Sequence, residues 1–96
     1  MPFFLIEIPM SEPGPLELER ATRTLDAAQA RLLRSRTATH LVIAGITADD
    51  GRLVCLIEAP DLEAVRHLVT LALLPAARIR QVTHLTRGPG ADRPAA

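Results

Sequence analysis

The sequence predicts a single α+β domain in which strands and helices follow the order βαββαβ. Four short stretches are rich in apolar and β-branched residues, as strands are. Two further stretches carry apolar residues at helical spacing. Proline, glycine and aspartate punctuate the boundaries between them. Each predicted element is justified below in chain order.

Residues 3–8 form an apolar run that Pro9 closes, which predicts the first strand. A turn cluster at residues 11–14 follows, and Pro15 suits the first turn of a helix because its missing N–H is not needed there. In that helix the apolar residues recur at every third or fourth position, at Leu18, Ala21, Leu25, Ala28 and Leu32. This spacing predicts one buried helix face.

Residues 40–47 and 53–58 are β-rich on either side of a turn at residues 49–51, which predicts a hairpin. Asp61 is expected to cap a second helix from about Leu62 to Leu74, because Pro75 stops it. Residues 79–86 form the last predicted strand, so the domain spans residues 1–86, and residues 87–96 are expected to be a disordered tail. The chain thus consists of two βαβ-like halves. Together they give the ferredoxin-like arrangement, an antiparallel four-stranded sheet with both helices on one face.

The composition limits the possible partners. Of the 96 residues, 48% are hydrophobic but only two are aromatic, so the core is aliphatic and the surplus apolar surface favours an oligomer. Eleven acidic residues balance eleven basic ones, which argues against nucleic acid as a partner. Glu7 and Pro9 interrupt the first apolar run, so neither a signal peptide nor a membrane span is expected. The lone Cys55 fits a reducing, cytoplasmic location.

Strict alternation along each strand divides the predicted sheet into two faces. The set expected under the helices is Phe4, Ile6, Ile8, Leu41, Ile43, Gly45, Leu53, Cys55, Ile57, Ile79, Gln81, Thr83 and Leu85. The opposite set is Phe3, Leu5, Glu7, His40, Val42, Ala44, Ile46, Val54, Leu56, Glu58, Arg80, Val82 and His84. This second face is too apolar to lie in water, so we expect a second copy to cover it. The homodimer would then be a dimeric α+β barrel that encloses a cavity.

One part of the chain resembles a known family. The run CLIEAPDLEAVR at residues 55–66, the segment LPAARI at residues 74–79 and FFLIE at residues 3–7 resemble small actinobacterial proteins that are labelled nickel-binding protein or domain of unknown function. The resemblance covers residues 2–86 and implies a dimeric, ferredoxin-like fold. The metal-binding branch of that family carries histidines in the first strand and the second helix. Here the first strand offers Glu7, and His67 in the helix is flanked differently.

The ionisable residues of the second face are the candidate site. Glu7, Glu58 and His84 are predicted to move protons. The two glutamates are expected to repel one another on neighbouring strands, so that one holds a proton and the other acts as a base. The residues predicted to bind a substrate are Arg80, His40, Leu5, Val42 and Leu56. Simpler interpretations stay open: a glutamate pairs with Arg80, the histidines sit in solvent, and Cys55 is an inert core thiol.

The predicted function is a cofactor-independent enzyme of the isomerase or cyclase type that acts on a small hydrophobic metabolite. The chain contains no CxxC, HExxH or GxSxG motif and no phosphate-binding glycine loop. One alternative is a non-catalytic protein that binds nickel or another divalent metal, which carboxylate and imidazole ligands suit. Another is an interaction module whose apolar second helix docks a partner protein.

Overall fold

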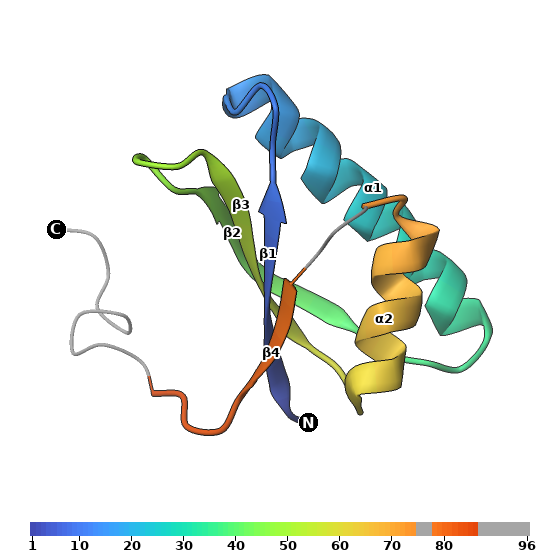
Figure 1. The fold of residues 1–96 in the computed structure, drawn as a ribbon. Coiled ribbons are helices and arrows are strands. Elements are labelled where there is room, and N and C mark those ends of the chain that lie inside the picture. Colours follow the sequence, from blue (N-terminus) through green and yellow to red (C-terminus); the bar gives the residue numbers. More distant parts are fainter. Residues whose placement is uncertain (75–77, 87–96) are drawn as a thin grey trace, which may run out of the picture.

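The computed structural model describes residues 1–74 and 78–86, and it confirms the predicted ferredoxin-like α+β fold. The elements are β1 (Phe3–Pro9), α1 (Pro15–Arg34), β2 (His40–Ile46), β3 (Arg52–Glu58), α2 (Leu62–Leu71) and β4 (Arg78–Val82). The strands form one sheet in the order β2-β3-β1-β4, and every neighbouring pair is antiparallel. Both helices cover the same face of this sheet (Figure 1).

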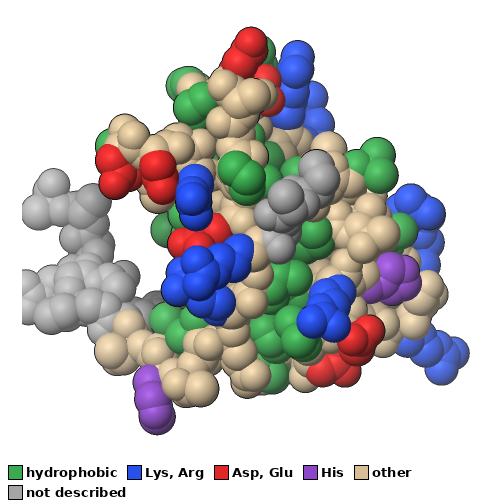
Figure 2. Space-filling view, in the orientation of Figure 1, with side chains coloured by type: hydrophobic (Ala, Val, Ile, Leu, Met, Phe, Trp, Pro, Cys, Tyr) green, Lys and Arg blue, Asp and Glu red, His purple; other side chains and the backbone are tan. Residues whose placement is uncertain are grey.

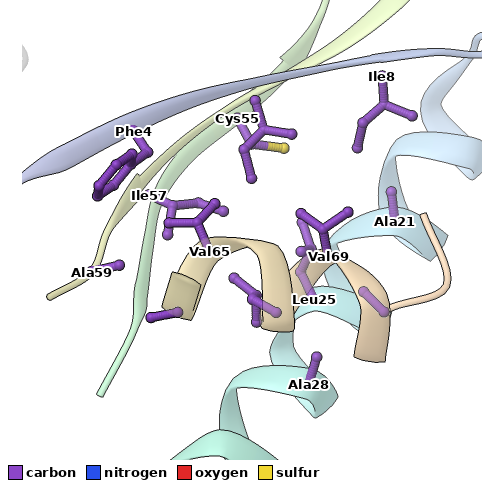
Figure 3. Close-up of a cluster of buried hydrophobic side chains, with 14 of the residues drawn as sticks. Phe4, Ile8, Ala21, Leu25, Ala28, Cys55, Ile57, Ala59, Val65 and Val69 are labelled. Atoms are coloured by element: carbon purple, nitrogen blue, oxygen red, sulfur yellow. The ribbon is translucent and has the colours of Figure 1, made fainter. Parts of the chain in front are cut away.

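The core lies between the helices and the sheet. Side chains from β1 and β3 point toward those of α1 and α2, with Phe4, Cys55 and Ile57 opposite Leu25 and Val65 (Figure 3). Four of the five residues in the predicted stripe of α1 are buried, and Leu18 packs against the core. Among the described residues, the buried set contains no polar or charged side chain. Apolar burial therefore holds the two layers together.

The two helix starts match the sequence prediction. Pro15 opens α1 directly after Gly14. Asp61 is the N-cap of α2, where its carboxylate oxygen accepts a hydrogen bond of 2.8 Å from the backbone N–H of Ala64. This bond satisfies a backbone donor that the helix itself leaves unpaired.

The end of α2 differs from the prediction. The helix ends at Leu71, three residues before the expected Leu74, and Pro75 lies outside the described residues. Leu73 adopts a left-handed backbone with φ of 56°, and the N–H of Leu74 donates back to the carbonyl of Val69 at 3.2 Å. This is the Schellman pattern of helix termination, in which glycine is the usual left-handed residue. A local backbone reversal, and not the proline alone, therefore ends the helix.

Replacing Leu73 by glycine is expected to stabilise the fold by about 1 kcal/mol. The leucine bears the cost of a left-handed backbone, and its side chain is 84% exposed, so its removal loses little packing. Urea denaturation measures the change in the free energy of unfolding. Ala72→Gly is the matched control, because Ala72 is right-handed and buried, and its replacement should destabilise. A destabilised Leu73→Gly variant would show that the leucine side chain makes contacts that outweigh the strain.

The edge strands also depart from simple alternation. A β-bulge lies between Leu41 and Ile43, so that Ile43 pairs with Leu56 and Ala44 with Cys55. Ile43 and Gly45, which alternation placed under the helices, therefore lie on the opposite face. Ala44 and Ile46, predicted on that face, pack against the core instead. The bulge inverts the predicted facing of the second half of β2.

The last strand is shorter than predicted. It ends at Val82, four residues before Thr86, and the residues that follow it up to Thr86 are exposed. Leu85, predicted under the helices, is 51% exposed. The predicted tail at residues 87–96 lies outside the described residues. In the described part of the chain, neither helix has the length and apolarity needed to cross a lipid bilayer.

Candidate functional site

The sheet face that the helices leave uncovered holds most of the candidate residues, and we call it the open face (Figure 1). The strand register arranges it in three rows across the sheet. The first row is His40, Glu58, Phe3 and Val82; the second is Ile43, Leu56, Leu5 and Arg80; the third is Gly45, Val54, Glu7 and Arg78. The middle row is thus apolar up to its last member, and charges occupy both outer rows.

Glu7 and Arg80 form the ion pair of this face. The guanidinium Nη2 of Arg80 donates to Oε1 of Glu7 at 3.0 Å, across the neighbouring strands β1 and β4. The Glu7 side chain is only 20% exposed, whereas that of Arg80 is 50% exposed. The expectation that a glutamate pairs with Arg80 is therefore confirmed for Glu7. In the space-filling view, basic and acidic side chains lie together beside β1 and β4, with hydrophobic side chains around them (Figure 2).

Glu58 lies at the other end of the open face. It is opposite Phe3 of β1 and His40 of β2, whereas Glu7 is opposite Val54. The rows of the two glutamates are four positions apart along β1, from Phe3 to Glu7, which is about 13 Å along the strand. The two glutamates share a face and lie on adjacent strands, but the register does not place them next to one another within one chain, so the chain itself does not bring about their predicted repulsion. His40 is the titratable side chain that the register places beside Glu58.

His84 does not join the predicted acid–base group. It follows the end of β4 and is exposed, beyond the row that contains Val82 and Phe3. Glu7 lies two rows farther along the sheet. The three predicted proton-transfer residues therefore occupy separate places within one chain.

A shallow apolar depression of about 340 Å³ lies on the open face between β1, β2 and β3. Leu5 and Leu56, both predicted to bind a substrate, line it together with Val54. Val42, also predicted to bind a substrate, lies at the bulge and does not line the depression. Ile43 lines the depression in its place. Alternation missed Ile43, which is 66% exposed. The interior glycine Gly45 was the available signal, because glycine within a strand often marks a bulge.

Cys55 lies on the other side of the sheet and is completely buried among apolar side chains. Removal from water raises the pKa of its thiol from the ordinary 9.0 to about 11. At neutral pH the thiol holds its proton and no solvent reaches it, so the group cannot act as a nucleophile. The expected inert core thiol fits this environment.

The raised pKa of the Cys55 thiol predicts how the free energy of unfolding depends on pH. The chain contains neither lysine nor tyrosine, so no other side chain has an ordinary pKa between 9 and 11. Between these values the unfolded chain releases the thiol proton while the folded chain keeps it. Stability is therefore retained below pH 9 and falls by roughly 2–3 kcal/mol as the pH rises to 11. Urea denaturation across this range measures the loss, and Cys55→Ala should remove the slope. An equal fall in stability with pH in the Cys55→Ala variant would show that the Cys55 thiol is not its cause.

No cluster of three or more His, Cys, Asp or Glu side chains able to hold a metal ion occurs among residues 1–74 and 78–86. Glu7 is engaged by Arg80, and His67 projects from α2 on the far side of the sheet. His67 lines an open groove of about 770 Å³ beside the start of α2, whose N-terminus is already occupied by the Asp61 carboxylate.

Known proteins assign neither a family nor a function to this chain. No family model matches the chain, and no curated protein matches it. Among solved structures, the chain is similar to a de novo designed protein with a ferredoxin fold, determined by NMR in solution. The two share 16% identity over 99% of this chain and 94% of the designed one, with a TM-score of 0.46. The ferredoxin-like assignment rests on the element order and strand order of this chain itself.

Proposed function

We propose that the protein is a homodimer that binds a small hydrophobic molecule between the open faces of its two copies. The observation that carries this proposal is the apolar middle of the open face. Leu5, Leu56 and Ile43 form one row across three strands, and Ile43 is 66% exposed in the single chain. A contiguous apolar patch on a sheet is a typical site of association, because its burial removes it from water.

A second copy is the occupant that best fits this face. Sheets that stack face to face stand about 10 Å apart, and their side chains interdigitate. The depression of about 340 Å³ on each open face would leave a gap between the stacked sheets that the side chains of the second copy do not fill. A small apolar molecule would fill that gap. The resemblance to the dimeric actinobacterial family fits the same arrangement.

We place binding before catalysis in this proposal. Glu7 accepts a hydrogen bond from Arg80, and Glu58 and His84 lie too far along the sheet to share a substrate atom with it in one chain. A mechanism that uses two of these groups together as acid and base would require that the second copy bring its own Glu58 or His84 over Glu7. Binding needs only the apolar row.

The third interpretation, docking through an apolar α2, loses most of its basis. Leu68, Val69 and Ala72 are buried in the core, and Leu71 and Leu74 pack against it. Among the apolar residues from Leu68 to Leu74, only Leu73 is widely exposed, at 84%. A single exposed leucine does not make a docking helix.

Titration with the neutral fluorescent probe N-phenyl-1-naphthylamine tests the binding step. We expect saturable fluorescence enhancement with one probe for each pair of chains. Val54→Asp, which places a charge in the lining of the depression, should abolish it. Leu33→Asp, on the exposed side of α1, is the matched control and should bind normally. Equal loss in both variants, or none in either, would contradict a site on the open face.

A further inference from the structure

The charge of the open face is uneven. In its third row Arg78 lies directly opposite Glu7, and Arg80 of the second row is paired with the same glutamate at 3.0 Å. Among the described residues, Arg78 takes part in no ion pair. The next basic side chain along the sheet, Arg52, is engaged by Asp50 at 3.1 Å. One carboxylate thus faces two guanidinium groups, which leaves one positive charge in excess.

This charge adjoins the apolar depression. Arg80 is directly opposite Leu5, and Glu7 is directly opposite Val54, and both of these apolar residues line the depression. Neighbouring strands are about 4.8 Å apart, so Glu7 and Arg80 begin one strand away from the apolar floor, and Arg78 begins two strands, about 10 Å, from Val54. A molecule that lies in the depression therefore reaches the arginines with one end.

A ligand must match both parts of this surface. A guanidinium group binds a carboxylate through two parallel hydrogen bonds, which gives direction as well as attraction. A neutral ligand would leave the Arg78 charge without a partner under the second copy, which is unfavourable. A cationic ligand would add repulsion. An apolar body with one carboxylate satisfies the floor and the excess charge together.

We propose that the ligand is a hydrophobic monocarboxylate whose carboxylate is bound by Arg78, beside the Glu7–Arg80 pair. This inference rests on the proposed function, because it requires that the open face bind a small molecule. Glu7 then sets the specificity for the charge of the ligand. It neutralises Arg80, so the site keeps one net positive charge and binds a ligand with one negative charge. Naphthalene-sized bodies are well within about 340 Å³.

Two compounds of the same shape test the inference, naphthalene-2-carboxylate and naphthalene-2-carboxamide, in calorimetric titrations of the full chain at pH 7 and low salt. We expect the carboxylate to bind about tenfold more tightly, as a charged hydrogen bond predicts. Arg78→Gln should remove this preference by weakening the binding of the carboxylate. Arg78→Lys should keep part of it, because the charge remains without the bidentate geometry. Glu7→Gln should strengthen carboxylate binding, because it releases Arg80.

Arg66→Gln is the matched control, since Arg66 is an exposed arginine on α2 that pairs with Glu63. It should leave both affinities unchanged. Three outcomes would overturn the inference and leave the proposed function standing. They are equal binding of the two compounds, a preference that survives Arg78→Gln, and binding of the neutral probe without binding of the carboxylate. Failure of both compounds and of the neutral probe would overturn the proposed function and this inference with it.

Discussion

In the proposed homodimer, replacing Leu56 by aspartate is expected to separate the two copies into folded monomers. Leu56 lies in the middle of the apolar row, between Ile43 and Leu5, and lines the depression. In the single chain this side chain is only half-buried, so the monomer tolerates a charge there. Between two stacked sheets an uncompensated carboxylate costs several kcal/mol, and a twofold dimer would bury two of them. Size-exclusion chromatography with light scattering measures the change in mass.

Circular dichroism of the Leu56→Asp variant separates loss of assembly from loss of folding. The monomer should keep the helix signal of the parent protein, because α1 and α2 pack on the other face of the sheet. Leu33→Asp again serves as control, since Leu33 is 63% exposed on α1, and it should remain a dimer. A Leu56→Asp protein that stays dimeric would place the interface elsewhere.

Replacing Leu25 by alanine is expected to destabilise the fold by about 2–5 kcal/mol. Leu25 is completely buried at the centre of the α1 stripe, against the sheet and α2. The substitution removes its packing and leaves a cavity that a close-packed core refills only partly. A domain of this size has a total stability of roughly 5–14 kcal/mol, so the loss is a large share of it. Urea denaturation at one fixed protein concentration gives the value.

Leu33→Ala is the control for the core prediction, because it makes the same chemical change eight residues along the same helix at an exposed position. It should change the free energy of unfolding by no more than about 0.5 kcal/mol. Similar losses at both positions would mean that the burial of Leu25 does not set its contribution, because alanine has a higher helix propensity than leucine and cannot cause the loss at Leu33. Such a result would contradict the description of the core.

The helices and the fold class were predictable because each rests on a local pattern. The spacing of Ala21, Leu25 and Ala28 marks the buried face of α1 without any knowledge of its partners. Asp61 and Pro15 mark helix starts by the chemistry of single backbone groups. On β1 and β3, strict alternation places Glu7 and Leu56 correctly on the open face.

The positions along the strands were not predictable in the same way. The rows of Glu7 and Glu58 depend on the register between β1 and β3, which tertiary packing sets and alternation does not reveal. The bulge next to Ile43 inverts the facing of half a strand, and only Gly45 hints at it. Leu73 ends α2 by a left-handed turn that its own residue type disfavours. The candidate site therefore keeps Glu7, Arg80, Leu5 and Leu56 together but separates Glu58 and His84 from Glu7.

The mass of the protein in solution tests the central claim most directly. Light scattering on the eluting protein at micromolar concentration should report twice the mass of one chain, because the proposed dimer covers the apolar open face with a second copy. The same mass should persist on dilution through this range. A particle with the mass of one chain would contradict the account, because the open face would then lie in water and enclose no cavity.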